Sequence, residues 1–181
     1  MKRHLNGLIL RYFILLIIAL FGLPILTKIL SFLTIKAVFI ILNIFYTTNI
    51  SEDVIIFNSI AIRLIPACIA VSAYYLLLIF NLTTPMGLKT RIKSIFFLLI
   101  SFFTINLIRI ITIAIIFERG YEYFDLIHNL SWYILSTLMV LSLWFINIYL
   151  FKIKSLPVYT DVKEVLKIIK SSNKHDKRNP K

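Results

Sequence analysis

The feature that most constrains the fold of this chain is a series of apolar runs close to the length that crosses a membrane. A transmembrane helix needs about 20 mostly apolar residues to cross a hydrocarbon core of about 30 Å. Five runs approach or exceed that length, at residues 8–26, 29–46, 68–82, 94–117 and 126–150. Hydrophobic residues make up 60% of the chain and its mean hydropathy is +0.91, more apolar than soluble domains. We therefore predict an all-α fold, a polytopic transmembrane bundle of about five helices.

The distribution of charge predicts the domain organisation. The chain has a net charge of +12, but its basic residues gather at the ends of apolar runs and in the C-terminal tail. Basic residues in these places face anionic lipid on the inner side of a membrane, so we expect membrane lipid and no nucleic acid as their partner. We predict a multi-pass membrane domain over residues 1–156, with its motifs in residues 50–150. A basic cytoplasmic tail follows at 157–181, with a short amphipathic helix at 161–170.

The loops between the apolar runs predict the orientation in the cell membrane. Lys89, Arg91 and Lys93 form a predicted basic loop, which the positive-inside rule places in the cytoplasm together with the tail. The acidic segments at 52–53 and 118–125 then lie on the extracytoplasmic side. Five spans with a cytoplasmic C-terminus put the basic N-terminus outside, and an extra half-membrane segment between residues 29 and 65 would remove this conflict.

The chain's single cysteine lies where an irregular segment meets an apolar helix. Residues 47–65 contain polar clusters and an apolar piece too short to span, so we predict a re-entrant or interfacial segment there. Pro66 suits the first turn of a helix, because its missing N–H would have no partner there anyway. Cys68 then lies near the helix start. Taken alone, one cysteine in such a helix is more often a small packing residue than a nucleophile.

Two further polar residues lie on the same predicted side of the membrane. Arg109 interrupts the fourth run, at a cost of about 2.5–3.5 kcal/mol on insertion scales, so we expect it to face the bundle interior or a cavity. Asn106 lies one helical turn earlier on the same face and can orient the guanidinium. His128 begins the fifth run. Taken singly, His128 is more often an interfacial residue, and Arg109 can equally pair with an acidic side chain or line a transport path.

Together, Cys68, Arg109 and His128 form a set suited to acyl transfer. The cysteine would attack a peptide carbonyl, the histidine would take the thiol proton and later protonate the leaving amine, and the arginine would stabilise the oxyanion. The sequence Pro66-Ala67-Cys68, the Asn-x-x-Arg motif at residues 106–109 and the histidine that follows resemble the exosortase/archaeosortase family. Members of this family are multi-pass membrane cysteine transpeptidases.

The resemblance covers residues 50–150 and implies a role for each residue. Cys68 would be the nucleophile, Arg109 the transition-state or substrate-binding residue, and His128 the proton-transfer residue. It implies a peptidase that cleaves a C-terminal sorting signal of exported proteins outside the membrane and passes the new C-terminus to a surface anchor. The family usually has a small residue and then a glycine after the cysteine, where this chain has Ile69 and Ala70.

Two other classes of function remain open from the residues alone. The first is a small transporter or transporter-accessory protein, in which Arg109 binds an anionic solute. The second is a non-enzymatic assembly partner for polysaccharide or secretion machinery, in which none of the three residues matters individually. We predict neither a metal site nor a cofactor. The three histidines lie in unrelated segments, and no glycine-rich phosphate loop is present.

Overall fold

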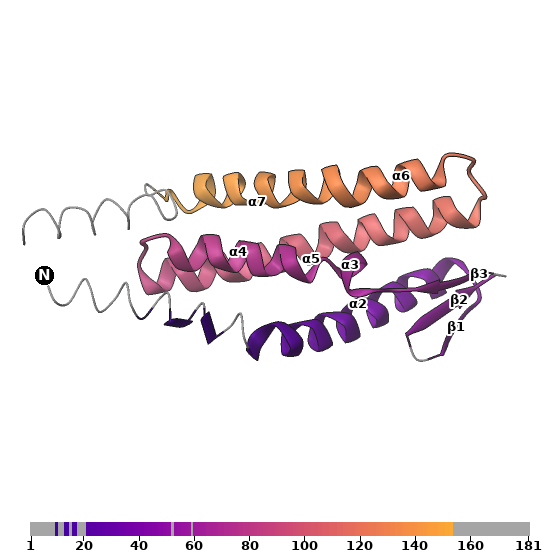
Figure 1. Cartoon of the computed structure of the whole chain (residues 1–181), viewed down its shortest axis with the longest axis horizontal. Helices are drawn as coiled ribbons and strands as arrows, with labels where there is room; N and C mark the ends of the chain where they lie inside the picture. The colour runs from indigo at the N-terminus through magenta and orange to yellow at the C-terminus, as the bar shows by residue number, and fades with distance from the viewer. Residues whose placement is uncertain are drawn as a thin grey trace, which may run out of the picture.

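The computed structural model describes residues 21–51, 53–58 and 60–153, together with residues 10, 13, 14, 16 and 17. The described chain is mostly helical, with a small sheet at one end of a helical bundle (Figure 1). In chain order the elements are α2 (Leu23–Phe45), β1 (Thr48–Ser51), β2 (Val54–Phe57), β3 (Ile60–Arg63), α3 (Pro66–Ile69), α4 (Val71–Thr83), α5 (Leu88–Glu118), α6 (Phe124–Leu130), the π-helix η2 (Ser131–Leu135) and α7 (Ser136–Leu150).

Four helices in the described residues are long and apolar enough to cross a membrane. These are Leu23–Phe45, Pro66–Thr83, Leu88–Glu118 and Phe124–Leu150. They correspond to the last four predicted runs. The first of them begins earlier than predicted, because Pro24 lies in its opening turn, where proline is well tolerated.

Two predicted segments lie partly or wholly outside what the structure describes. The run at 8–26 is interrupted by residues that are not described, so a bundle of five spans is not confirmed. The amphipathic helix predicted at 161–170 falls entirely on such residues.

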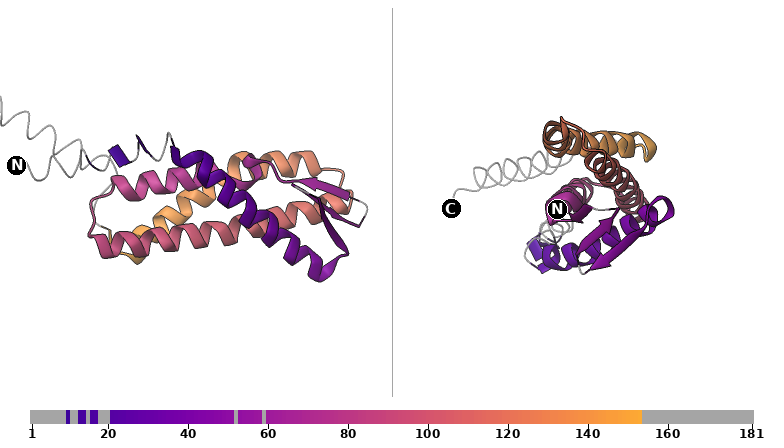
Figure 2. Two further views of the ribbon diagram at one scale, coloured as in Figure 1. Left: turned by 90° about the horizontal axis from the view of Figure 1, so that it is seen from below. Right: turned by 90° about the vertical axis from the view of Figure 1, so that its right-hand side faces the viewer.

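Helices α4 and α5 run side by side, and α2 crosses them obliquely (Figure 2). Helices α4, α5 and α7 meet in the larger of two buried apolar clusters. At its centre the rings of Tyr74 and Phe102 pack edge to face, with centroids 4.7 Å apart. Leu98, Val140 and Trp144 surround them and are almost completely buried. This cluster holds together the three helices whose other ends carry the candidate site.

The segment predicted to be re-entrant or interfacial forms a three-stranded antiparallel sheet in the order β1-β2-β3. The fold is therefore not purely helical. The apolar pieces of this segment are only four residues long and rich in isoleucine. Two residues separate each strand from the next. β-branched residues favour strands, and Asn58 has φ of 51°, as tight hairpin turns require.

One face of the sheet packs against the helices. Ile55 and Phe57 point to the same face of β2, and both are buried. They join the second apolar cluster, which includes Leu42 of α2 and Ile110 and Ala114 of α5. At the tip of the β2–β3 hairpin, the Asn58 amide donates a hydrogen bond of 2.8 Å to Glu118 Oε1. The sheet is thus held against the end of α5.

The opposite end of the bundle carries a group of basic residues at the start of α5. Helix α5 begins at Leu88, so Lys89, Arg91 and Lys93 lie in its first turns rather than in the predicted loop. The Arg91 guanidinium donates three hydrogen bonds of 2.9–3.0 Å to backbone carbonyls at the end of α4. It therefore caps carbonyls that have no partner within their own helix.

Three helices are also joined at this end by a buried polar chain. The Asn81 amide donates to Ser94 Oγ at 2.6 Å, and that hydroxyl donates to Asn147 Oδ1 at 2.8 Å. All three side chains are fully buried. The chain fixes the relative rotation of α4, α5 and α7.

Candidate functional site

Cys68 lies in a single helical turn that is separate from the long helix after it. Pro66 occupies the first turn of α3, as predicted, and α3 ends only three residues later, at Ile69. The Cys68 N–H donates to the carbonyl of Ile65 at 2.9 Å. The continuous helix predicted from residue 68 is therefore interrupted between α3 and α4.

The interruption is at Ala70, whose backbone is left-handed, with φ 59° and ψ 43°. This conformation costs a residue with a Cβ atom about 1–2 kcal/mol, and glycine adopts it freely. Ala70 is the second residue after the cysteine, where the family that the sequence resembles usually has glycine. The backbone reverses direction at this residue, which is a physical reason for a glycine there.

Side chains from α5 hold the end of α3. Arg109 is only 8% exposed, and its Nη2 donates to the Cys68 carbonyl oxygen at 2.8 Å. The Asn106 amide donates to the carbonyls of Ile69, at 3.1 Å, and Cys68, at 3.4 Å. These carbonyls lack partners in their own helix because α3 ends there. Asn106 was predicted to orient the guanidinium, and it instead binds the same piece of backbone.

A second support for Arg109 comes from the last described helix. Arg109 Nη1 donates to Ser136 Oγ, which in turn donates to the Ser131 carbonyl at 3.2 Å. The acceptor lies in the π-helical segment η2, and such segments are frequent at functional sites. The sequence analysis missed both serines. Hydroxyl residues are common in apolar helices, and no local pattern distinguishes these two.

The guanidinium keeps unused hydrogen-bonding capacity. Arginine has five N–H donors, and Arg109 donates one hydrogen bond through each of Nη1 and Nη2. Its buried Nε has no hydrogen-bond partner among the described residues. No ion pair joins Arg109 to an acidic side chain in this part of the chain, and Glu118 binds Asn58 instead. The guanidinium therefore retains N–H donors that no described side chain uses.

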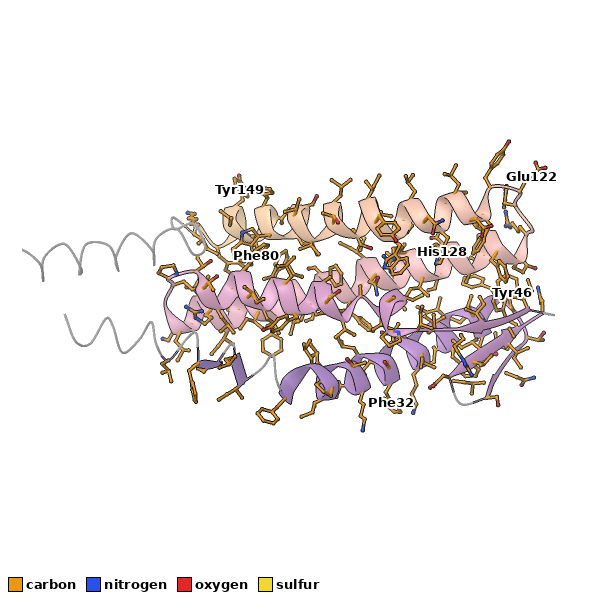
Figure 3. All side chains as sticks on the ribbon, viewed as in Figure 1. Phe32, Tyr46, Phe80, Glu122, His128 and Tyr149 are labelled. Carbon is orange, nitrogen blue, oxygen red and sulfur yellow. The ribbon has the colours of Figure 1, made fainter. Side chains whose placement is uncertain are left out.

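His128 lies on α6, on the side that faces α5 (Figure 3). Its ring stacks on Phe124 with centroids 5.6 Å apart and planes inclined by 8°. It makes no hydrogen bond with another residue that the structure describes. The stack therefore holds the plane of the imidazole and leaves both ring nitrogens available for proton transfer.

One cavity of about 310 Å³ brings these residues together. Cys68, Arg109, His128 and Ser131 all line it. Most of the remaining wall of the cavity is apolar. It is formed by β3, by α5, by η2 and by the segment that precedes α3, and it includes Leu64, Ile65, Ile110, Ile113, Phe117 and Trp132. The three residues predicted from sequence thus share a cavity, although they come from segments far apart in the chain.

Chemically, the cavity combines a thiol, an imidazole and a buried guanidinium in apolar surroundings. A low-dielectric wall strengthens the interaction between the guanidinium and any negative charge that develops beside it. Within the described residues, no group of three or more His, Cys, Asp or Glu side chains could hold a metal ion.

Comparison of the chain with protein-family models, curated proteins and solved structures finds no match in any of the three.

Proposed function

We propose that this protein is a membrane-embedded cysteine peptidase or transpeptidase, similar in kind to exosortases. Its substrates would be exported proteins with a C-terminal sorting signal, which it cleaves on the outer side of the membrane. The observation that carries this proposal is the shared cavity of Cys68, Arg109 and His128. The order and spacing of their sequence motifs support it independently.

Each residue has a defined role in the proposed reaction. Cys68 Sγ forms a bond to the carbonyl carbon of the scissile peptide, and its proton passes to His128. The resulting tetrahedral intermediate collapses, the C–N bond breaks, and His128 returns the proton to the leaving amine. A thioester then joins the substrate to Cys68. Attack by an amine or by water releases the product and restores the thiol.

Arg109 would act in two ways. Its hydrogen bond to the Cys68 carbonyl holds the turn that carries the nucleophile. Its charge, surrounded by apolar side chains, stabilises the oxyanion of the tetrahedral intermediate. Asn106 strengthens the first effect, because it binds the carbonyls of the same turn.

The distribution of charge supports an extracytoplasmic site in a multi-pass protein of the cell membrane. The cavity is lined by residues of β3, α3 and α6. These elements lie toward the end of the bundle that carries the sheet, and the start of α5, with its basic residues, lies at the other end (Figure 1). The positive-inside rule assigns the basic end to the cytoplasm. Large apolar side chains such as Phe32, Phe96 and Phe145 are exposed on the outer faces of three helices, where lipid would cover them.

The experiment that tests the proposal is a search for a covalent thioester on Cys68. The protein is co-expressed with a secreted reporter that carries a candidate sorting signal from the same genome. We expect a hydroxylamine-sensitive adduct in the unmodified protein and none in Cys68→Ala. Immunoblots of the membrane fraction confirm that each variant accumulates.

Two further variants separate the proposal from transport and from a structural role. His128→Ala should abolish processing, whereas Asn129→Ala, a change at the neighbouring exposed residue, should leave it intact. Processing that continues in Cys68→Ala would refute the proposal. If Arg109→Ala alone abolished a solute-dependent phenotype, Arg109 would instead act as an anion-binding residue in transport.

A further inference from the structure

The sheet has an edge without a strand partner on its β3 side. Strand β3 pairs only with β2, in an antiparallel register that matches Phe57 with Ile60 and Ile55 with Ile62. Two residues separate the strands, so Phe57 and Ile60 form the hydrogen-bonded pair that closes the hairpin. Hydrogen-bonded pairs alternate along an antiparallel ladder. The backbone N–H and C=O groups of Ala61 therefore point away from β2.

The same alternation applies to Arg63, which is matched with Val54. Its backbone groups also point to the free edge. Beyond the ladder, β3 makes no backbone hydrogen bond to another segment that the structure describes. Unpaired backbone groups of this kind are a template for another strand.

This edge forms a wall of the cavity that contains Cys68. Ala61, Ile62, Arg63, Leu64 and Ile65 all line it. The backbone remains extended at the end of this segment, since the residue before Pro66 has φ −82° and ψ 158°. The segment then enters the turn that carries the cysteine. One extended stretch therefore leads directly to the candidate nucleophile, and residues of α5, α6 and η2 form most of the rest of the wall.

We infer that the substrate binds in this cavity as an extended peptide, which adds a fourth strand to the sheet along β3. The inference rests on the proposed function and specifies how that site holds its substrate. Hydrogen bonds to Ala61 and Arg63 fix the backbone of the peptide, and its alternate side chains enter the apolar part of the cavity. The pairing places a carbonyl of the peptide beside Cys68.

The chemistry of the wall favours a peptide over other occupants. A lipid chain would fill apolar space but would leave the backbone N–H and C=O groups of the edge unpaired. A second copy of the sheet would need room for several strands beside β3, whereas residues of α5 and α6 line the same cavity. The volume of about 310 Å³ lies at the small end of the range for ligand sites and suits a short stretch of chain.

The chain's single cysteine allows a test that does not depend on catalysis. A hexapeptide of alternating valine and alanine with a C-terminal cysteine can form a reversible mixed disulfide with Cys68, in detergent and a thiol buffer. Mass spectrometry measures the tethered fraction. A series of these peptides carries one N-methyl group at each successive position. We expect methylation at alternate positions to lower the tethering constant about tenfold, and methylation between them to change it less than about twofold.

Matched proline variants test the edge itself. Ala61→Pro removes a donor that points into the cavity and takes no part in the ladder, a position where proline is tolerated in edge strands. Ile50→Pro makes the equivalent change on the outer edge of β1. In Ala61→Pro, we expect the effect of N-methylation on the tethering constant no longer to alternate along the peptide. In Ile50→Pro, we expect this alternation to persist.

Hydrogen exchange gives a second measurement that needs no variant. In the tethered protein, the amides of Ala61 and Arg63 should exchange at least tenfold more slowly than in the free protein. The strand pairing would be overturned if the protein tethers the peptide but shows neither the slower amide exchange nor the alternating effect of N-methylation. If the reporter is processed but the effect of N-methylation does not alternate, the peptidase proposal stands and only the pairing of the peptide with β3 is refuted. Alternation without processing supports the peptide site and refutes the peptidase proposal.

Discussion

Replacing Ala70 by glycine tests the backbone reversal that separates Cys68 from the long helix. Ala70 is left-handed, at φ 59° and ψ 43°, and is 7% exposed. Glycine would relieve a conformational cost of about 1–2 kcal/mol. It would also lose one buried methyl group, worth about 0.8 kcal/mol, and increase the freedom of the unfolded chain. We therefore expect Ala70→Gly to change the free energy of unfolding by less than about 0.5 kcal/mol.

The matched control is Ala73→Gly, in the first turn of α4. Ala73 also packs against the main apolar cluster, but its φ is not positive. Glycine costs a helix up to about 1 kcal/mol relative to alanine, and here no left-handed backbone offsets that cost. Ala73→Gly should therefore destabilise the protein by about 1–2 kcal/mol when the lost methyl contacts are included. The difference between the two variants isolates the effect of the left-handed backbone.

The measurement is unfolding in mixed micelles with increasing denaturing detergent. Tryptophan fluorescence reports the transition, because Trp144 is buried in the folded protein. A valine at position 70 provides the opposite perturbation, because β-branched residues strongly disfavour positive φ. We expect Ala70→Val to be the least stable of the three variants. Equal destabilisation by Ala70→Gly and Ala73→Gly would refute the assignment of a left-handed residue between Cys68 and α4.

Further variants test how the site and the bundle are held. Ser136→Ala removes the hydroxyl that accepts a hydrogen bond from Arg109. It should slow reporter processing about tenfold or more with little change in protein abundance. An unchanged processing rate would contradict a positioning role for Ser136. Arg109→Lys keeps the charge but loses the two-armed geometry, so we expect a similar or larger loss in the same assay. Ser94→Ala breaks the chain between three helices and should lower the free energy of unfolding by about 1 kcal/mol. Thr104→Ala, whose exposed hydroxyl binds only its own helix, should cost less than about 0.5 kcal/mol in the same unfolding measurement.

The candidate site was accessible from sequence because polar residues are conspicuous in apolar helices. An arginine inside a run of isoleucine and phenylalanine needs a protected environment, and Arg109 is indeed buried. Cys68 and His128 were found because each begins an apolar run. Ser136 gave no comparable signal, since a hydroxyl in such a helix can bind its own backbone. Its contact with Arg109 follows only from how α5 and α7 pack.

The sheet was missed although local signals for it were present. Short isoleucine-rich pieces separated by polar pairs, at residues 52–53 and 58–59, are typical of hairpins. In a chain dominated by long apolar runs, these pieces were interpreted as membrane segments too short to span. The deciding interaction is nonlocal, because Ile55 and Phe57 become buried only against α2 and α5.

The sequence by itself determined the four long apolar helices and the polar residues set within them. Both follow from local properties, namely the length of an apolar run and the cost of a charge inside it. Only the tertiary structure decided which polar groups meet. Arg109 reaches Cys68 across 41 residues and Ser136 across 27 residues. Such contacts depend on the rotation and crossing of packed helices, and the left-handed Ala70 sets where the cysteine lies among them.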